Sequence, residues 1–185
     1  MRLFLDRLYQ TALYFSALCL LIIGFLVGIQ LAGRILDGLL RLLGAEVFGW
    51  QILSLAEIAG YLLAAASFLA LAPTLKAGAH IRVTMLLSAF SEATRRYLEL
   101  TAFAFSSLAC AYMTWNLAHF AWVSFRFNEV SHGVVRVPLA YPQSVMAIGA
   151  LILTIALIDE MVTVLRSGRP TFRVTEDAIT LGKEG

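Results

Sequence analysis

Hydrophobic residues fall in four long blocks along the chain, and three shorter polar linkers separate them. The blocks cover about residues 10–33, 49–74, 97–123 and 139–163. A helix rises about 1.5 Å per residue and a bilayer core is about 30 Å thick, so about 20 apolar residues cross it. Because lipid offers the backbone no hydrogen-bond partners, each block is predicted to be a transmembrane helix. We therefore expect an all-α membrane protein, with one four-helix domain over residues 1–170 and a polar cytoplasmic tail at 171–185.

The first polar linker has an amphipathic pattern. In RILDGLLRLLGAE, residues 34–46, the charged side chains follow i, i+3, i+7 spacing on one helical face, and leucine and isoleucine cover the rest. The pattern predicts a separate short helix that lies in the membrane interface after the first span. Gly44 is expected to end it, because glycine adopts the left-handed conformation common after helix C-termini.

The second linker, residues 76–96, is the most basic part of the chain, with Lys76, Arg82, Arg95 and Arg96. Its middle, residues 81–90, is apolar enough to dip into the membrane interface. Ser91 is predicted to cap the start of the third helix, since a serine hydroxyl accepts a hydrogen bond from a free amide there.

Composition excludes several classes of protein. The chain is 60% hydrophobic and 14% charged, whereas soluble domains are typically about 45–50% apolar and about 25% charged. No basic run points to nucleic acid, and Cys19 and Cys110 lie singly inside apolar blocks as packing residues. The uncharged run at residues 8–33 exceeds the roughly 7–15 apolar residues of a signal peptide, so we interpret it as a retained first span.

Charge asymmetry predicts the orientation. With the N-terminus inside, ten of the 14 Lys and Arg residues fall on the inner side and four on the outer side. Basic residues gather on the cytoplasmic side of membrane proteins. Both termini are therefore expected in the cytoplasm, and the stretch NEVSHGVVRVPLAYPQ, residues 128–143, faces outward.

Glu57 is the acid expected inside a span, where charge is costly and usually functional. It lies about 10 Å along a helix from Trp50, an expected interfacial anchor, so its predicted depth is shallow. Three interpretations stay open for Glu57: an ion pair with Arg34 or Arg136, a contact with a partner protein, or a proton relay.

The remaining chemistry is sparse. His80 and His119 are expected on opposite sides of the membrane, and His132, on the same side as His119, lies in a loop, which disfavours a haem held between two helices. GxxxG-type spacing at Gly24 and Gly28, and at Gly60 and Ala64, allows close helix approach but is common in membrane bundles. No nucleophile–base pair, metal cluster or phosphate loop is present in the sequence, and no pair of Gly/Pro-interrupted spans of the kind that builds a transport site. We expect an accessory bundle that is neither an enzyme nor a transporter alone.

Several motifs in order resemble one family. GAHIRVTML at residues 78–86 carries a family motif through Gly78, His80 and Arg82. Arg34 closes the first span, and Glu57 stands in SLAEIAGYL near the start of the second. SHGVVRVPLAYPQSVMAIG at 131–149 and DEMVTVLRSGRP at 159–170 complete the pattern, although Thr84 replaces a usual aspartate. The chain thus resembles the small membrane subunit, of DctQ type, of tripartite ATP-independent periplasmic (TRAP) transporters.

The resemblance implies partners and a location. Such a system has a periplasmic substrate-binding protein and a large membrane subunit that carries an organic acid, such as a C4-dicarboxylate or a sialic acid, with sodium. The small subunit would be a scaffold in the bacterial inner membrane, with no cofactor and no substrate site of its own. Its outward loop would contact partner proteins through His132, Pro138, Tyr141, Pro142 and Gln143, the prolines fixing the start of the fourth helix. The competing classes are a haem- or quinone-binding anchor of a redox complex and a structural membrane protein without a transport role.

Overall fold

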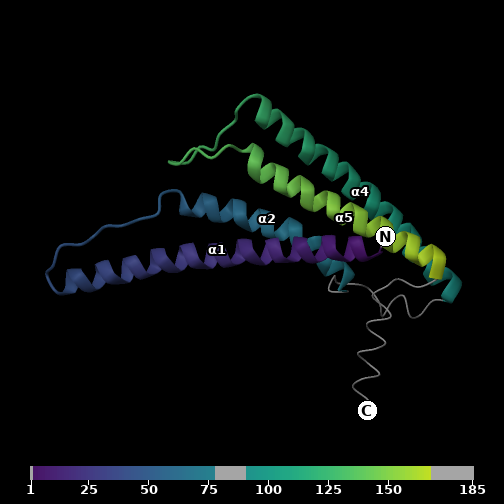
Figure 1. The fold of residues 1–185 in the computed structure, drawn as a ribbon, viewed down its shortest axis with the longest axis horizontal. Helices are drawn as coiled ribbons and strands as arrows, with labels where there is room; N and C mark the ends of the chain where they lie inside the picture. Colours follow the sequence, from purple (N-terminus) through teal and green to yellow (C-terminus); the bar gives the residue numbers. More distant parts are fainter. Residues whose placement is uncertain (1, 78–90, 168–185) are drawn as a thin grey trace, which may run out of the picture.

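The computed structural model describes residues 2–77 and 91–167, and the described chain is helical. Its helices are α1 (Arg2–Leu42), α2 (Leu55–Lys76), α4 (Glu92–Arg126) and α5 (Ala140–Ser167). Figure 1 shows two antiparallel pairs, α1 with α2 and α4 with α5, which converge at the end that carries the N-terminus and diverge toward the other end. Within the described residues the only β-pairing is an isolated bridge between Val130 and Pro138, so the all-α prediction is confirmed.

The prediction of a separate amphipathic helix at residues 34–46 is wrong. α1 continues without a break through Leu42, a length of about 60 Å, or twice a bilayer core. Charged side chains on one face do not interrupt backbone hydrogen bonds, and helix formers continue to Leu43. The helix ends where Gly44 takes φ +70° and the Gly44 and Ala45 amides bond the Arg41 and Leu40 carbonyls. This Schellman arrangement confirms Gly44 as the stop.

The segment between α1 and α2 runs back along α1 rather than starting the second span at residue 49. The Asp37 carboxylate accepts hydrogen bonds from the Phe48 and Gly49 amides, at 3.0 and 3.1 Å. Further on, the Gln30 side-chain oxygen accepts one from the Ile52 amide at 3.0 Å. Polar side chains of α1 therefore hold the returning backbone, and α2 begins only at Leu55.

The helices lie in a row in the order α4, α5, α2, α1, because the main contacts join each to the next. α1 touches α5 only slightly. A buried core forms where α1, α2 and α5 meet, and its members are Tyr9, Ala12, Leu69, Ala72, Leu75, Ile152, Leu153, Ala156 and Leu157. The row is thus an open layer rather than a closed four-helix bundle.

A close helix contact joins α2 to α5 at Gly149. A Cβ atom at this position would lie 2.7–2.8 Å from Phe68 atoms, including its backbone, so only glycine fits there. The predicted GxxxG positions are different, because a Cβ at Gly24, Gly28 or Gly60 would meet no atom within 4 Å. Small residues do permit close approach, but the contact lies at a glycine outside the predicted motifs.

Three of the helices in the described chain, α1, α2 and α5, are long and apolar enough to cross a membrane, and α4 is not among them. Ser91 caps α4 as predicted, its hydroxyl accepting from the Thr94 amide at 3.4 Å. α4 ends like α1, with Asn128 at φ 51° and the Glu129 amide bonded to the Ser124 carbonyl at 2.9 Å. Asparagine tolerates this left-handed conformation better than most residues.

Candidate functional site

Two polar clusters hold the ends of the helical layer. The first lies where the pairs diverge, between the start of α2 and the loop at residues 127–139 (Figure 1). The loop folds back on itself through hydrogen bonds from Ser131 to Val137 and from Leu139 to Glu129, at 2.8 and 3.0 Å. Its tip then reaches α2, since the Val135 amide donates to the Ser54 hydroxyl oxygen at 3.0 Å. We call the whole contact between this loop and the start of α2 the loop latch.

Glu57 is part of the loop latch. It lies in the first turn of α2, where a carboxylate is stabilised by the free amides and the positive end of the helix dipole. Its Oε1 accepts from the Tyr61 hydroxyl at 2.9 Å, and its Oε2 has no hydrogen-bond partner in the described part of the chain. A Cβ atom at Gly133 would lie 1.7 Å from Oε2, so the loop backbone packs directly on the carboxylate.

The helix boundary changes the interpretation of Glu57. Residues 50–54 are not helical, so the distance from Trp50 does not measure depth along a helix. Instead the Trp50 ring lies 3.6 Å from where a Cβ at Gly33 would be, against α1. Glu57 therefore lies in the first turn of α2, at the end of the candidate span Leu55–Lys76.

Neither predicted arginine pairs with Glu57 among the described residues. Arg34 is exposed on α1 and lines a groove of about 390 Å³ against the face of α2 that carries Leu55, Ala56 and Ala59. Glu57 lies on another face of that helix, turned to the loop. Arg136 belongs to the loop but is exposed. An ion pair of Glu57 with a partner subunit stays a prediction.

The other predicted loop residues lie around the start of α5. His132, Pro138 and Tyr141 are exposed, whereas Pro142 and Gln143 are half-buried. The Pro138 carbonyl accepts from the Tyr141 amide at 3.3 Å, and Pro142 stands in the first turn, where its missing amide hydrogen costs nothing. Gly78, His80 and Arg82 of the cytoplasmic family motif lie outside the described residues.

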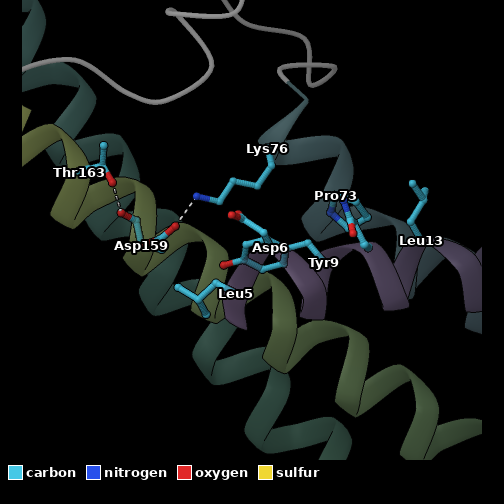
Figure 2. A pocket seen from close by; sticks show the side chains of 9 residues that line it. Leu5, Asp6, Tyr9, Leu13, Pro73, Lys76, Asp159 and Thr163 are labelled. Carbon is cyan, nitrogen blue, oxygen red and sulfur yellow. Dashed lines mark hydrogen bonds and ion pairs between the residues drawn. The ribbon is translucent and has the colours of Figure 1, made fainter. Parts of the chain in front are cut away.

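The second polar cluster lies where the helix pairs converge. Lys76 at the end of α2 forms ion pairs with Asp159 and Glu160 of α5, the latter at 2.9 Å. The Lys76 ammonium also lies 5.5 Å from the ring centre of Tyr9 on α1. Figure 2 shows Lys76 reaching across to Asp159, with Asp6 and Tyr9 below it. Glu160 is fully buried, so the positive charge of Lys76 helps to stabilise its carboxylate. We call this group the ionic cluster.

A pocket of about 380 Å³ opens beside the ionic cluster. Its lining combines charged and hydroxyl groups with leucine side chains, and Figure 2 shows Leu5, Asp6, Tyr9, Leu13, Pro73, Lys76, Asp159 and Thr163. The Tyr9 hydroxyl is buried and has no hydrogen-bond partner in the described chain. No group of three or more His, Cys, Asp or Glu side chains in residues 2–77 and 91–167 is arranged to hold a metal ion.

The sequence analysis did not predict the ionic cluster, nor the contact of Gly133 with Glu57 in the loop latch. Lys76 and the Asp159–Glu160 pair end two blocks that the predicted topology brings to the same side, so opposite charge was a usable signal. Gly133 gave no comparable signal, because a glycine in a polar loop is usually a turn residue. Its contact with Glu57 depends on how the loop folds over α2.

Comparison with known families gives the identity. A family model described as "Tripartite ATP-independent periplasmic transporters, DctQ component" matches residues 37–167, which include α2, α4, α5 and both polar clusters except Tyr9. The chain belongs to the DctQ family of TRAP transporter components. Neither the curated proteins nor the solved structures gave a match to it. The resemblance found in the sequence is thereby confirmed, and the protein is a small membrane subunit of a transporter.

Replacing Gly133 by alanine should open the loop latch of this DctQ subunit. The new methyl group must displace the Glu57 carboxylate, the end of a flexible side chain, so the cost should lie in the lower part of the range of about 1–3 kcal/mol that is typical of overpacking. Amides of residues 131–137 should then exchange about tenfold faster or more with deuterium, measured by mass spectrometry in detergent. His132→Ala, at an exposed neighbour, should leave the rates unchanged. Equal exchange in both variants would contradict the contact.

Replacing Lys76 by methionine should destabilise the DctQ subunit by up to about 3–5 kcal/mol, because it removes one positive partner from a fully buried carboxylate. Thermal unfolding in detergent measures the effect. Arg41→Met, which removes an exposed cation, should change stability by less than about 0.5 kcal/mol. Adding Asp159→Asn and Glu160→Gln to Lys76→Met should recover part of the loss. A Lys76→Met variant as stable as Arg41→Met would show that the ionic cluster contributes little.

Proposed function

We propose that this DctQ subunit is the scaffold of a sodium-gradient-driven TRAP transporter for organic acids. It holds the large permease subunit in the membrane and helps the periplasmic binding protein to dock. The observation that carries the proposal is the family match over residues 37–167. Membership in a family of transporter components favours this function over the haem- or quinone-binding anchor. Sodium and substrate are assigned to the large subunit, and this chain needs no cofactor.

The geometry supports a scaffold rather than a moving part. The ionic cluster and the core tie α1, α2 and α5 together at one end, and the loop latch closes the other. The loop latch faces the side on which a periplasmic binding protein would arrive, and its exposed residues His132, Arg136 and Tyr141 are available for contact.

We propose four spans, including α4, with both termini in the cytoplasm of a bacterium and the loop latch in the periplasm. This arrangement is supported by the helix ends, since the starts of α1 and α4 and the ends of α2 and α5 lie at one end of the layer (Figure 1). In a version without Cys19 and Cys110, a single cysteine at exposed Ala77 should resist an impermeant thiol reagent added to spheroplasts. A cysteine at His132 should react. The reverse pattern would invert the topology.

The subunit should not transport alone. Liposomes that contain only this chain, with a sodium gradient, the binding protein and candidate organic acids, should take up no more substrate than empty liposomes. Adding the large subunit should start sodium-dependent uptake of an acid that the binding protein holds. Uptake by this chain alone would refute the scaffold function, because a scaffold has no route for substrate.

Glu57→Gln separates a scaffold role from a transport role within the same assay. It keeps the shape of the side chain but removes its charge, so it should weaken recovery of the large subunit and lower uptake of all substrates together. Competition between two acids should be unchanged. A normal complex with altered sodium coupling or substrate preference would place Glu57 on the transport route.

A further inference from the structure

One of the two helices at the edges of the row, α4, is less apolar than the two helices at its centre. A helix at the edge of a membrane layer exposes most of its surface to lipid, so it should be among the most apolar. α1 at one edge follows this rule, but α4 at the other edge does not. α2 and α5 at the centre are apolar enough to span, whereas α4 falls short. α4 as a whole is therefore less apolar than its place at the edge of the row leads us to expect.

Large side chains form a regular seam on that side. They alternate at spacings of three and four residues, and we call the surface they make the outer face of α4: Phe105, Leu108, Tyr112, Trp115, His119 and Trp122. The five aromatic and leucine side chains are 63–76% exposed. Thr114, by contrast, contacts Thr154 of α5 at 3.3 Å. A sustained 3–4 spacing is typical of a helix that packs against another helix in a left-handed pair.

Two polar side chains, His119 on the outer face and Asn116 beside it, need a partner that lipid cannot supply. Asn116 lies about 10 Å from the middle of α4, within the roughly 15 Å half-thickness of a bilayer core. Its amide nitrogen donates to the Tyr112 carbonyl at 2.8 Å, but its side-chain oxygen and the exposed His119 ring bond to nothing in the described chain. Asn and His in spanning helices typically hydrogen-bond to a neighbouring helix.

A groove next to the outer face offers space for a partner's side chains. Its volume is about 340 Å³, and it lies where α4 meets α5. Alanines line much of it: Ala118, Ala121, Ala140 and Ala147. Trp122 belongs to both the groove and the outer face. Small residues allow close helix approach, so a helix on the outer face would also contact α5 there.

We propose that the outer face of α4 is the surface on which a transmembrane helix of the large permease subunit packs. This inference rests on the proposed function, which supplies a membrane partner. The facing helix would be apolar, with small or β-branched residues opposite the aromatic rings and a hydrogen-bonding side chain opposite Asn116 and His119. Lipid would cover α1 at the opposite edge, where leucine and phenylalanine are exposed.

Photo-crosslinking tests the assignment in the intact complex. Benzoylphenylalanine replaces Tyr112 or Trp115 on the outer face, and Leu21 or Phe25 on α1 as controls of similar exposure. The small and large subunits carry different tags and are produced together in membranes. Irradiation should join the two subunits from the α4 positions and not from the α1 positions.

Each other outcome overturns the inference. Adducts of two small subunits from Tyr112 or Trp115 would assign the outer face to a second copy, and lipid adducts alone would assign it to the bilayer. Crosslinks to the large subunit from α1 only would leave the proposed function standing and move the interface. If the unmodified subunits do not co-purify, the proposed function fails first.

A substitution measures how much the outer face of α4 contributes to binding of the large subunit. Trp115→Ala should reduce the large subunit recovered with the tagged small subunit about tenfold, since buried tryptophans often dominate interfaces. Phe25→Ala should not change recovery. Circular dichroism of each small subunit verifies that it stays helical, and the crosslinks decide the case if Trp115→Ala does not fold. Unchanged recovery of a folded Trp115→Ala variant would contradict the assignment.

Discussion

The close contact between α2 and α5 positions every other helix in the described chain. Lipid solvates an apolar helix about as well as another helix does, so association in a membrane depends on shape. Gly149 lets the Phe68 backbone approach to a distance that no side chain would allow. α1 then packs on α2, and α4 packs on α5. The contact at Gly149 joins the α1–α2 pair to the α4–α5 pair, and the four helices therefore form one row.

Charged and polar groups secure this layer at its two ends. Where the helix pairs converge, Lys76 neutralises a fully buried Glu160 and also contacts Asp159. Where they diverge, the loop rests on Glu57 and donates a hydrogen bond to Ser54. A buried ion pair adds little net stability, but losing one partner is costly. Such contacts therefore specify one arrangement of the helices more than they strengthen it.

In the part of the chain that the structure describes, the α4 edge of the helical layer has polar side-chain atoms without a partner. This arrangement suits a subunit that binds another membrane protein along that edge. α1 presents hydrocarbon-compatible side chains along its length, while α4 presents rings with Asn116 and His119 among them. The two edges thus differ in what they can contact. Under our proposal, this asymmetry gives the layer one side for lipid and one side for the large subunit of the TRAP transporter.

The sequence by itself determined the helical class, the family, the stop after α1 at Gly44 and the start of α4 at Ser91, because these depend on local properties. Apolar length dictates helices in lipid, and Gly44 and Ser91 act on their own backbone neighbours. The sequence misled where charge was taken as a break, since Arg34 and Asp37 leave the hydrogen bonds of α1 intact. Only the tertiary structure decided which faces meet. Glu57 meets Gly133 instead of an arginine, and Lys76 meets Glu160 across 84 positions of sequence. Such pairings depend on how each helix is rotated about its axis, and no local pattern encodes that rotation.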